Sequence, residues 1–351
     1  GIGGISMSGL AEVLLEKGFR VSGSDNRESE LTKMLAQKGA ILFYGQRAEN
    51  ITDDVELVVY TAAIHDDNPE MQETIRRGLP KLTRAELLGQ MMRNYRTPIA
   101  VSGTHGKTTT TSMIAMILMS AGLDPTVSVG GMLPEIGGNI RVGSSGYFLT
   151  EACEYTNSFL SFYPRIGIIL NIEEDHLDFF KDLADIRHSF REFASLLGEN
   201  GTLIINADIP AYEEITRELP CRVITFALKN PEADYTADQI AYDQTGAAGF
   251  DAKSHGETRH FTLQVPGEHN VLNALSAIAL SDVLQIPDEK IREGLSSFRG
   301  TDRRFQIKGK LKEITVVDDY AHHPTEIRAT LNAAAKYPKD RIICVFQPHT
   351  Y

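Results

Sequence analysis

The sequence has no tryptophan, only three cysteines, and no apolar run long enough to cross a membrane. Cys153, Cys221 and Cys344 are odd in number and far apart, which argues against a disulfide framework and suits a reducing cytosol. Basic residues are also few, since 35 Lys and Arg stand against 47 Asp and Glu, for a formal net charge of -12. These absences predict a cytoplasmic protein that neither binds nucleic acid nor inserts into a membrane.

The length and composition indicate a soluble globular protein with more than one domain. At 351 residues the chain exceeds one ordinary hydrophobic core, so two or three domains are expected. Its content of 42% hydrophobic and 23% charged residues is typical of soluble globular proteins. Because the chain begins inside a glycine loop without a methionine, we expect that it is a piece of a longer protein.

Residues 98–111 have the pattern of a phosphate-binding loop, with a short apolar strand, a glycine-bounded turn carrying one lysine, and an apolar helix over 109–121. Gly103 and Gly106 allow the tight turn that points backbone N–H groups inward. Lys107 is placed to reach the outer phosphates of a nucleotide, and the Thr108 hydroxyl is placed to bind magnesium. The pattern predicts a nucleotide phosphate site.

This phosphate-loop motif is a shortened one. The full motif has a glycine at position 101, where this chain has Val101. The alternative is a glycine turn with a solvated lysine, but a strand and a helix fall where phosphate binding needs them.

The first nine residues, GIGGISMSG, form a second glycine loop. A helix follows, with Gly18 as its expected C-cap, and then a strand over 20–25 that ends in Asp25. In the fingerprint of a dinucleotide site, the glycines lie under a pyrophosphate, and an acid about 20 residues further on binds a ribose hydroxyl. In this chain Ser6 replaces the third glycine of that fingerprint. We expect a nucleotide or nucleotide sugar here; a plain strand-turn-helix is the alternative.

Alternating helices and strands continue to about residue 92. We expect a helix over 31–38, strands over 40–44 and 57–61, a helix capped by Asn68, and a last helix opened by a capping box at 83–86. The polar residues 93–97 that follow have no pattern, which places the first domain at 1–92 and the second from 93.

Polar residues follow two predicted strands of the second domain. A strand over 146–150 delivers Glu151, and a strand over 165–170 is followed by Asn171 and then His176. Ligands of parallel sheets bind at these strand ends, and magnesium prefers oxygen ligands such as Glu151. The alternative is that Glu151 and His176 are surface polar residues.

A third candidate segment lies at the start of a helix near residue 267. Asn270 and Asn273 share a face there and suit contact with an adenine edge, and His269 could stack on its ring. The alternative is helix capping by asparagine, which we favour on this segment alone. Between 222 and 265, alternating runs at 235–242 and 261–265 predict antiparallel strands beside the main sheet.

Four separate motifs together resemble the Mur ligase family. They are GTHGKTTT at 103–110, NIEEDHLD at 171–178, GEHNVLNA at 267–274, and RRF at 303–305 followed by DDYAHHPTE at 318–326. The resemblance covers essentially the whole chain in order. It implies an α/β protein with a Rossmann-like UDP-sugar-binding domain at 1–92, a central ATP-binding domain of the P-loop ATPase type with added antiparallel strands at 93–300, and a C-terminal Rossmann-like domain at 301–351.

Only the beginning of that third domain is expected in this chain. A strand over 311–317, a helix over 324–337 and a strand over 341–346 make one unit, which is too little to bury the faces of a layered domain. We therefore expect the 351-residue chain to show no ligase turnover, even if its central domain binds nucleotide.

The resemblance further implies an ADP-forming ligase of peptidoglycan precursor synthesis that uses ATP and Mg²⁺. The opening loop and residues 64–70 look most like the branch that joins L-alanine to the lactyl carboxylate of UDP-N-acetylmuramate through an acyl phosphate. No lysine occurs between Asp182 and Asn200, where other branches use a carbamylated lysine, and this suits the alanine-adding branch.

Site residues carry over from the family motifs by position. Lys107 and His176 would be catalytic, and the magnesium ligands would be Thr108, Glu151 and His176. The ATP-binding residues would be Gly103, Thr104, His105, Gly106, Lys107, Thr108, Thr109, His269, Asn270, Asn273, Arg304, Asp319, Tyr320 and His322. The UDP-sugar-binding residues would be Gly3, Gly4, Ser6, Met7, Ser8 and Asp25. His349 would approach the amino-acid site.

The chain departs from the family's motifs in two places, and three alternatives to the proposed activity stay open. Ser6 weakens the pyrophosphate contact, and of the acidic run that the family often has after the strand, only Glu151 and Glu154 are present. Within the family, a recycling ligase that attaches a tripeptide to the same UDP-sugar shares nearly all these motifs. Outside it, an NAD-dependent dehydrogenase would explain only the opening loop, and a regulatory nucleotide-binding module would bind ATP without catalysis.

Overall fold

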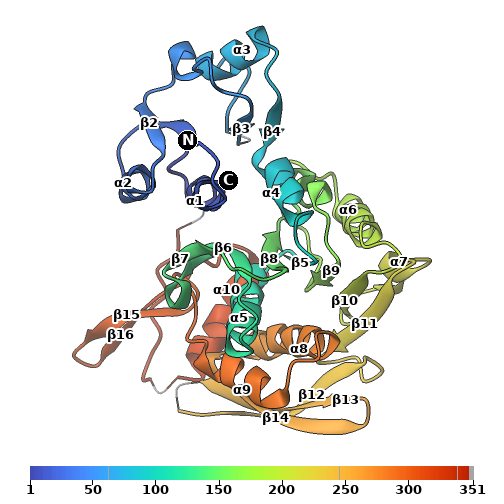
Figure 1. The fold of residues 1–351 in the computed structure, drawn as a ribbon. Coiled ribbons are helices and arrows are strands. Elements are labelled where there is room, and N and C mark those ends of the chain that lie inside the picture. Colours follow the sequence, from blue (N-terminus) through green and yellow to red (C-terminus); the bar gives the residue numbers. More distant parts are fainter. Residues whose placement is uncertain (62, 245, 338, 348–351) are drawn as a thin grey trace.

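A computed structural model describes residues 1–61, 63–244, 246–337 and 339–347 (Figure 1). A ten-stranded mixed sheet dominates them. In spatial order its strands are β14 (Glu257–Pro266), β13 (Ala247–Ser254), β12 (Tyr235–Tyr242), β11 (Arg222–Ala227), β10 (Thr202–Asn206), β9 (Ile166–Ile169), β5 (Thr97–Ser102), β8 (Tyr147–Ala152), β6 (Thr126–Leu133) and β7 (Gly138–Arg141).

The predicted central α/β architecture with added antiparallel strands is confirmed. Strands β6, β8, β5, β9, β10, β11 and β12 are parallel, while β7 at one edge and β13 and β14 at the other run antiparallel to their neighbours. Ser102 of β5 lies beside Ala152 of β8 and Ile169 of β9, so three strands end together where the glycine loop begins. Glu151 is paired with Val101 inside β8, rather than following the strand as the sequence predicted.

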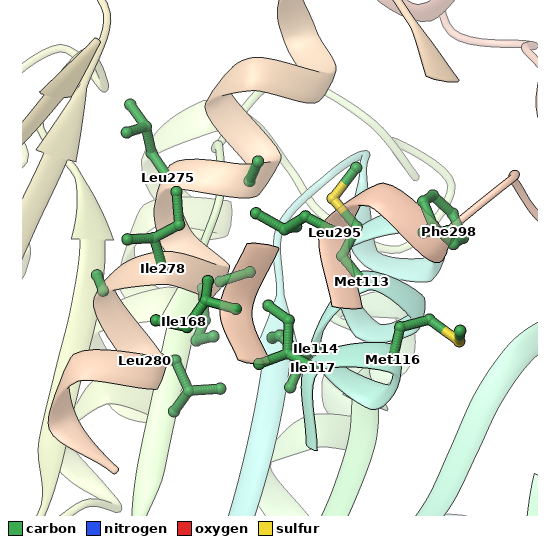
Figure 2. Packing of buried hydrophobic residues seen from close by; sticks show 14 of the residues in the cluster. Met113, Ile114, Met116, Ile117, Ile168, Leu275, Ile278, Leu280, Leu295 and Phe298 are labelled. Carbon is green, nitrogen blue, oxygen red and sulfur yellow. The ribbon is translucent and has the colours of Figure 1, made fainter. Parts of the chain in front are cut away.

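Helices cover both faces of the sheet because successive residues of a strand point to opposite sides. Ile99 and Val101 pack with α5 (Lys107–Ser120), α8 (Glu268–Val283) and α9 (Asp288–Ser297). Figure 2 shows Ile114 and Ile117 of α5 gathered with side chains from α8 and α9. On the other face, Ala100 packs with α4 (Arg84–Met92) and α6 (Leu183–Ser195).

The helix α5 is buried along nearly its whole length, as its continuous apolar sequence predicts. It ends at Ser120, and Gly122, two residues on, has a φ of 71°, the left-handed conformation expected of a glycine after a helix. The remaining short elements of the central region are η2 (Pro134–Ile136), η3 (Tyr155–Ser161) and α7 (Glu213–Thr216).

The N-terminal region, blue in Figure 1, holds two small parallel sheets, β1–β2 and β3–β4. The predicted caps are present, because the Asn68 side chain accepts bonds from Glu70 and Met71 N–H, and Thr83 and Glu86 form a reciprocal capping box. Its elements are α1 (Ile5–Glu16), β1 (Ser22–Asp25), α2 (Glu30–Gln37), β2 (Ile41–Tyr44), η1 (Ala48–Asn50), β3 (Val58–Tyr60), α3 (Pro69–Arg76) and β4 (Lys81–Thr83).

The C-terminal region holds an antiparallel hairpin, β15 (Gln306–Leu311) with β16 (Ile314–Asp318), and the helix α10 (Pro324–Ala335). The strand predicted over 341–346 is wrong, since these residues have no regular structure and Val345 is 94% exposed. An apolar run becomes a strand only beside a partner, and no described strand pairs with this one. Within the described ranges, no helix is both long and apolar enough to span a membrane.

Candidate functional site

The loop between β5 and α5 has the geometry of an anion cradle. Gly103 and Gly106 have φ values of 145° and 82°. A Cβ on Gly106 would lie 2.9 Å from Oδ1 of Asn273, so glycine is required both by backbone conformation and by space. No side chain caps α5, which leaves the N–H groups of its first turn, including those of Thr108 and Thr109, available to an anion.

The segment after β9 braces this loop. Asn171 Oδ1 accepts a bond from His105 N–H at 2.9 Å, and Thr104 Oγ1 accepts one from Glu173 N–H at the same distance. The His105 Nε2 atom lies 3.0 Å from Glu173 Oε1, and this bond is the main cause that lowers the pKa of Glu173 to about 2. Thr104 and His105 therefore hold the loop in place through their polar atoms.

Lys107 is folded back against its own loop and a buried acid. Its Nζ lies 3.0 Å from Glu154 Oε2 and 3.0 Å from the Thr104 carbonyl oxygen, and it also donates to the Gly103 carbonyl. Burial alone would lower the pKa of Lys107, but the charges of Glu154, Cys153 and Glu151 and the bond to Glu154 together outweigh it, and the pKa is raised. Lys107 is thus a fixed positive charge at the mouth of the loop.

The side-chain oxygens of Thr108 and Glu151 lie together next to Lys107. Thr108 Oγ1 donates to Glu151 Oε2 at 3.2 Å, and the other oxygen of Glu151 accepts from Gly130 N–H. Burial raises the pKa of the Glu151 carboxyl. Such a pair fits Mg²⁺, which takes one or two protein oxygens and completes its shell with water and phosphate oxygens. The described residues contain no group of three His, Cys, Asp or Glu side chains placed to hold a metal alone.

His176 lies beside Glu154 rather than in an ion pair with Glu151. Its Nε2 is 3.9 Å from Glu154 Oε1, and its ring is 4.5 Å from the ring of Tyr155. The backbone at His176 is left-handed, with φ of 52°, and Thr156 and Asn157 have φ values of 55° and 56°. Left-handed conformations of non-glycine residues cost energy and concentrate at functional sites.

His269 and Asn270 lie on the first turn of α8, and Asn273 lies on the second. Asn270 Nδ2 donates to the Pro266 carbonyl at 2.7 Å, and Asn273 Nδ2 donates to Asn270 Oδ1 at 3.2 Å. The alternative of an asparagine cap is wrong, because the N-cap is Gly267, which has no side chain. Asn273 adjoins Gly106, so this turn of α8 is next to the phosphate loop, and His269 is exposed beside it.

The residues predicted from the C-terminal region also gather in one place. Arg304 Nη1 is 3.3 Å from Glu326 Oε1, and its guanidinium lies 5.7 Å from the ring of Tyr320. The Tyr320 and His322 rings meet edge to face at 5.2 Å. Asp319 accepts backbone N–H bonds from Phe305 and Ala321, each at 2.7 Å. His349 lies outside the described residues.

The C-terminal region contacts the segment after β9 that braces the phosphate loop. Thr325 Oγ1 donates to Glu173 Oε2 at 2.5 Å, and His323 Nε2 lies 3.0 Å from the Glu174 carbonyl oxygen. Glu173 therefore bonds to His105 through one oxygen and to the start of α10 through the other. The contact joins the C-terminal region to the loop that would hold phosphate.

The opening loop is held by Asp25. Gly3 N–H donates to Asp25 Oδ2 at 2.8 Å, and Asn26 N–H donates to Oδ1 at the same distance. Gly4 is the N-cap of α1 and, having no side chain, leaves the first turn uncapped. Asp25 thus holds the opening loop through Oδ2, and the ribose contact that the sequence predicts for this acid stays a prediction.

The other predicted residues of the opening loop have different surroundings. Ser8 is buried, with its hydroxyl bonded to the Ile5 carbonyl inside α1, so it faces the core. Met7 lines a hollow between α1, β1 and β3. Ser6 is exposed, and its hydroxyl accepts a bond from Arg84 Nη1 at 3.0 Å.

Arg84 is a residue of this site that the sequence did not reveal. Burial lowers the pKa of its guanidinium, while the nearby Cys153 and Glu151 act in the opposite direction. Its contact with Ser6 and its proximity to Glu151 place it where the opening loop meets the Thr108–Glu151 pair. The two candidate sites therefore adjoin, with a cation between them.

Comparison with known proteins agrees with this arrangement. Residues 1–96 match the model of the Mur ligase family catalytic domain, 101–281 that of the Mur ligase middle domain, and 303–350 that of the Mur ligase glutamate ligase domain. This chain belongs to the Mur ligase family, as its motifs predicted.

Individual relatives point to one branch of the family. The UDP-N-acetylmuramate–L-alanine ligases of Agathobacter rectalis and Lachnospira eligens are 60% and 58% identical to this chain over its full length, which covers 76% and 77% of theirs. The structure of UDP-N-acetylmuramate-alanine ligase from Thermotoga maritima superposes with a TM-score of 0.82 at 34% identity, over 96% of this chain and 76% of that one.

A ligase of another name has nearly the same fold. The murein peptide ligase of Psychrobacter arcticus superposes with a TM-score of 0.81 at 28% identity, over 97% of this chain and 76% of that one. Fold similarity therefore does not separate the two kinds of ligase, whereas sequence identity favours the alanine branch.

Proposed function

We propose that this protein is an ATP-dependent ligase that joins L-alanine to the lactyl carboxylate of UDP-N-acetylmuramate, in peptidoglycan precursor synthesis. The observation that carries the proposal is 60% identity along the whole chain to an enzyme of that name. The cradle at Gly103–Lys107 and the adjoining opening loop support the proposal, since they would offer the two nucleotides of this reaction separate sites.

In the first step, a carboxylate oxygen of the sugar attacks the γ-phosphorus of ATP, ADP leaves, and an acyl phosphate forms. Lys107 and the free N–H groups at the start of α5 would bind the phosphate oxygens on which charge develops. Thr108 and Glu151 would hold Mg²⁺, with His176 near the acceptor side; when bound, the ion neutralises phosphate charge.

In the second step, the amine of L-alanine attacks the acyl carbonyl, phosphate leaves with the bonding electrons, and the amine loses a proton to give the amide.

The residues of α8 and the C-terminal region would surround the nucleotide. Arg304 would contact phosphate, while the residues toward the nucleoside would be His269, Asn270, Asn273, Asp319, Tyr320 and His322. The bond between Thr325 and Glu173 supports a role for the C-terminal region in covering the site, which protects an acyl phosphate from water.

The domain limits are part of the proposal. We place UDP-sugar binding in 1–92, ATP binding in 93–300, and the covering region in 301–351. Arg84 lies in the last helix of the first range and reaches Ser6 of the opening loop, which supports binding of an anionic group of the sugar nucleotide there.

The opening loop should bind UDP-N-acetylmuramate and not NADH. Both oxygens of Asp25 are engaged by backbone N–H groups, so the acid serves to shape the loop, and a dehydrogenase would leave the Lys107 and Thr108–Glu151 arrangement without a role. Isothermal titration calorimetry on the full-length protein, with both ligands run in parallel, checks this. Binding of NADH without binding of the UDP-sugar would overturn the assignment of this loop.

A further inference from the structure

We propose that Glu154 is a positioning residue that competes with nucleotide phosphate for the ammonium of Lys107, so that ATP binding exchanges the Lys107–Glu154 ion pair for a Lys107–phosphate contact. The inference rests on the proposed ATP-dependent function and assigns a role to an acid that this function does not otherwise use.

Glu154 is a buried charge with one close cation. The residue is 2% exposed, and its two carboxylate oxygens lie 3.0 and 3.4 Å from Lys107 Nζ. A buried carboxylate is costly unless it is paired, so this ion pair accounts for the presence of Glu154 inside the site. Removing the ammonium from Glu154 must therefore be offset by another interaction.

Every N–H group of the Lys107 ammonium already has an acceptor in this arrangement. It carries three N–H groups, and the structure gives it three kinds of acceptor, which are Glu154 and the carbonyl oxygens of Gly103 and Thr104. A phosphate oxygen can bind Lys107 only by replacing one of them. Glu154 is the charged member of the set and so the strongest competitor.

His176 offers Glu154 a second partner. Its Nε2 lies 3.9 Å from Glu154 Oε1 and 3.8 Å from Asp175 Oδ2, and its ring packs against the ring of Tyr155 at an angle of 32°. The hydroxyl of Tyr155 is itself anchored by Asp178 Oδ2 at 2.9 Å. Glu154 thus remains next to a nitrogen donor when Lys107 turns toward phosphate, which makes the exchange physically reasonable.

The direction in which a substitution of Glu154 changes nucleotide affinity distinguishes the proposed role from a structural one. In the full-length protein, Glu154→Gln should lower the dissociation constant for ADP about tenfold, because a neutral amide competes less well than a carboxylate for an ammonium. If Glu154 merely braces the loop, the same change raises the dissociation constant. Calorimetry with ADP measures this without any turnover.

Three comparisons make the test specific. Glu173→Gln changes an acid of the segment after β9, which bonds to His105 and not to Lys107, and it should give no tightening. In a Lys107→Gln background, Glu154→Gln should have no effect on ADP affinity, because the contested ammonium is gone. Glu154→Asp retains the charge with a shorter reach, so it should tighten binding less than Glu154→Gln and serves if that variant does not fold.

Two outcomes overturn the inference alone. One is unchanged or weaker ADP binding by a folded Glu154→Gln variant of a protein whose wild type binds ADP. The other is equal tightening with and without Lys107. Failure of the wild-type protein to bind ADP would instead reject the proposed ATP-dependent function.

Discussion

Replacing Lys107 with alanine should reduce ligase activity of the full-length protein by at least about 10³-fold, since charge placed against a transferring phosphoryl group is a large part of such catalysis. The structure fixes the ammonium of Lys107 on the carbonyls of Gly103 and Thr104. Phosphate release in the presence of ATP, L-alanine and UDP-N-acetylmuramate measures the effect. Activity within tenfold of wild type would contradict the assignment of Lys107.

Stability must be measured alongside, because Lys107→Ala leaves Glu154 buried without its ammonium. The double variant with Glu154→Gln removes that unpaired charge and should recover thermal stability while staying inactive. Lys290→Ala is the matched control, since the Lys290 side chain is half-exposed and pairs with Glu293 on the surface of α9. It should leave both activity and melting temperature unchanged.

Glu151→Gln should lower activity by roughly 10²- to 10³-fold and raise the Mg²⁺ concentration needed for nucleotide binding. Glutamine keeps the shape of the side chain and one acceptor oxygen, which can take the bond from either Thr108 or Gly130 but not from both. It loses the charge that a divalent cation prefers. Titration of Mg²⁺ against a fluorescent ATP analogue measures the shift.

The matched control for this change is Glu135→Gln, at an exposed acid of η2. It should leave the Mg²⁺ dependence as in wild type. An unchanged Mg²⁺ requirement in Glu151→Gln would show that Glu151 is not a metal ligand, and the raised pKa of its buried carboxyl would then need another role.

Local sequence signals predicted much of the fold because they act over a few residues. The cap at Asn68, the capping box at Thr83, and the glycine at 122 all mark helix ends as expected. The strand predicted over 341–346 failed because a strand depends on a partner that the local pattern does not specify. The supposed asparagine cap of α8 failed because Gly267 precedes the helix and both asparagines bond elsewhere.

The candidate site was predictable where a motif fixes the backbone, and not where it depends on distant contacts. Glycines and a lysine at 103–107 indicated the cradle, but its bracing by Asn171 and Glu173 joins residues more than 60 positions apart. The bond from Arg84 to Ser6 spans 78 positions. Periodicity and spacing carry no information about such pairs, so these residues came from the structure.

The choice of amine acceptor is the most direct test of the proposed function. Purified full-length protein would be given ATP, Mg²⁺ and UDP-N-acetylmuramate, with either L-alanine or the tripeptide used by recycling ligases, and phosphate release and product mass would be measured. We predict phosphate release that depends on L-alanine, with a product heavier than UDP-N-acetylmuramate by one alanine residue. Release with the tripeptide alone, or with neither amine, would contradict the proposal.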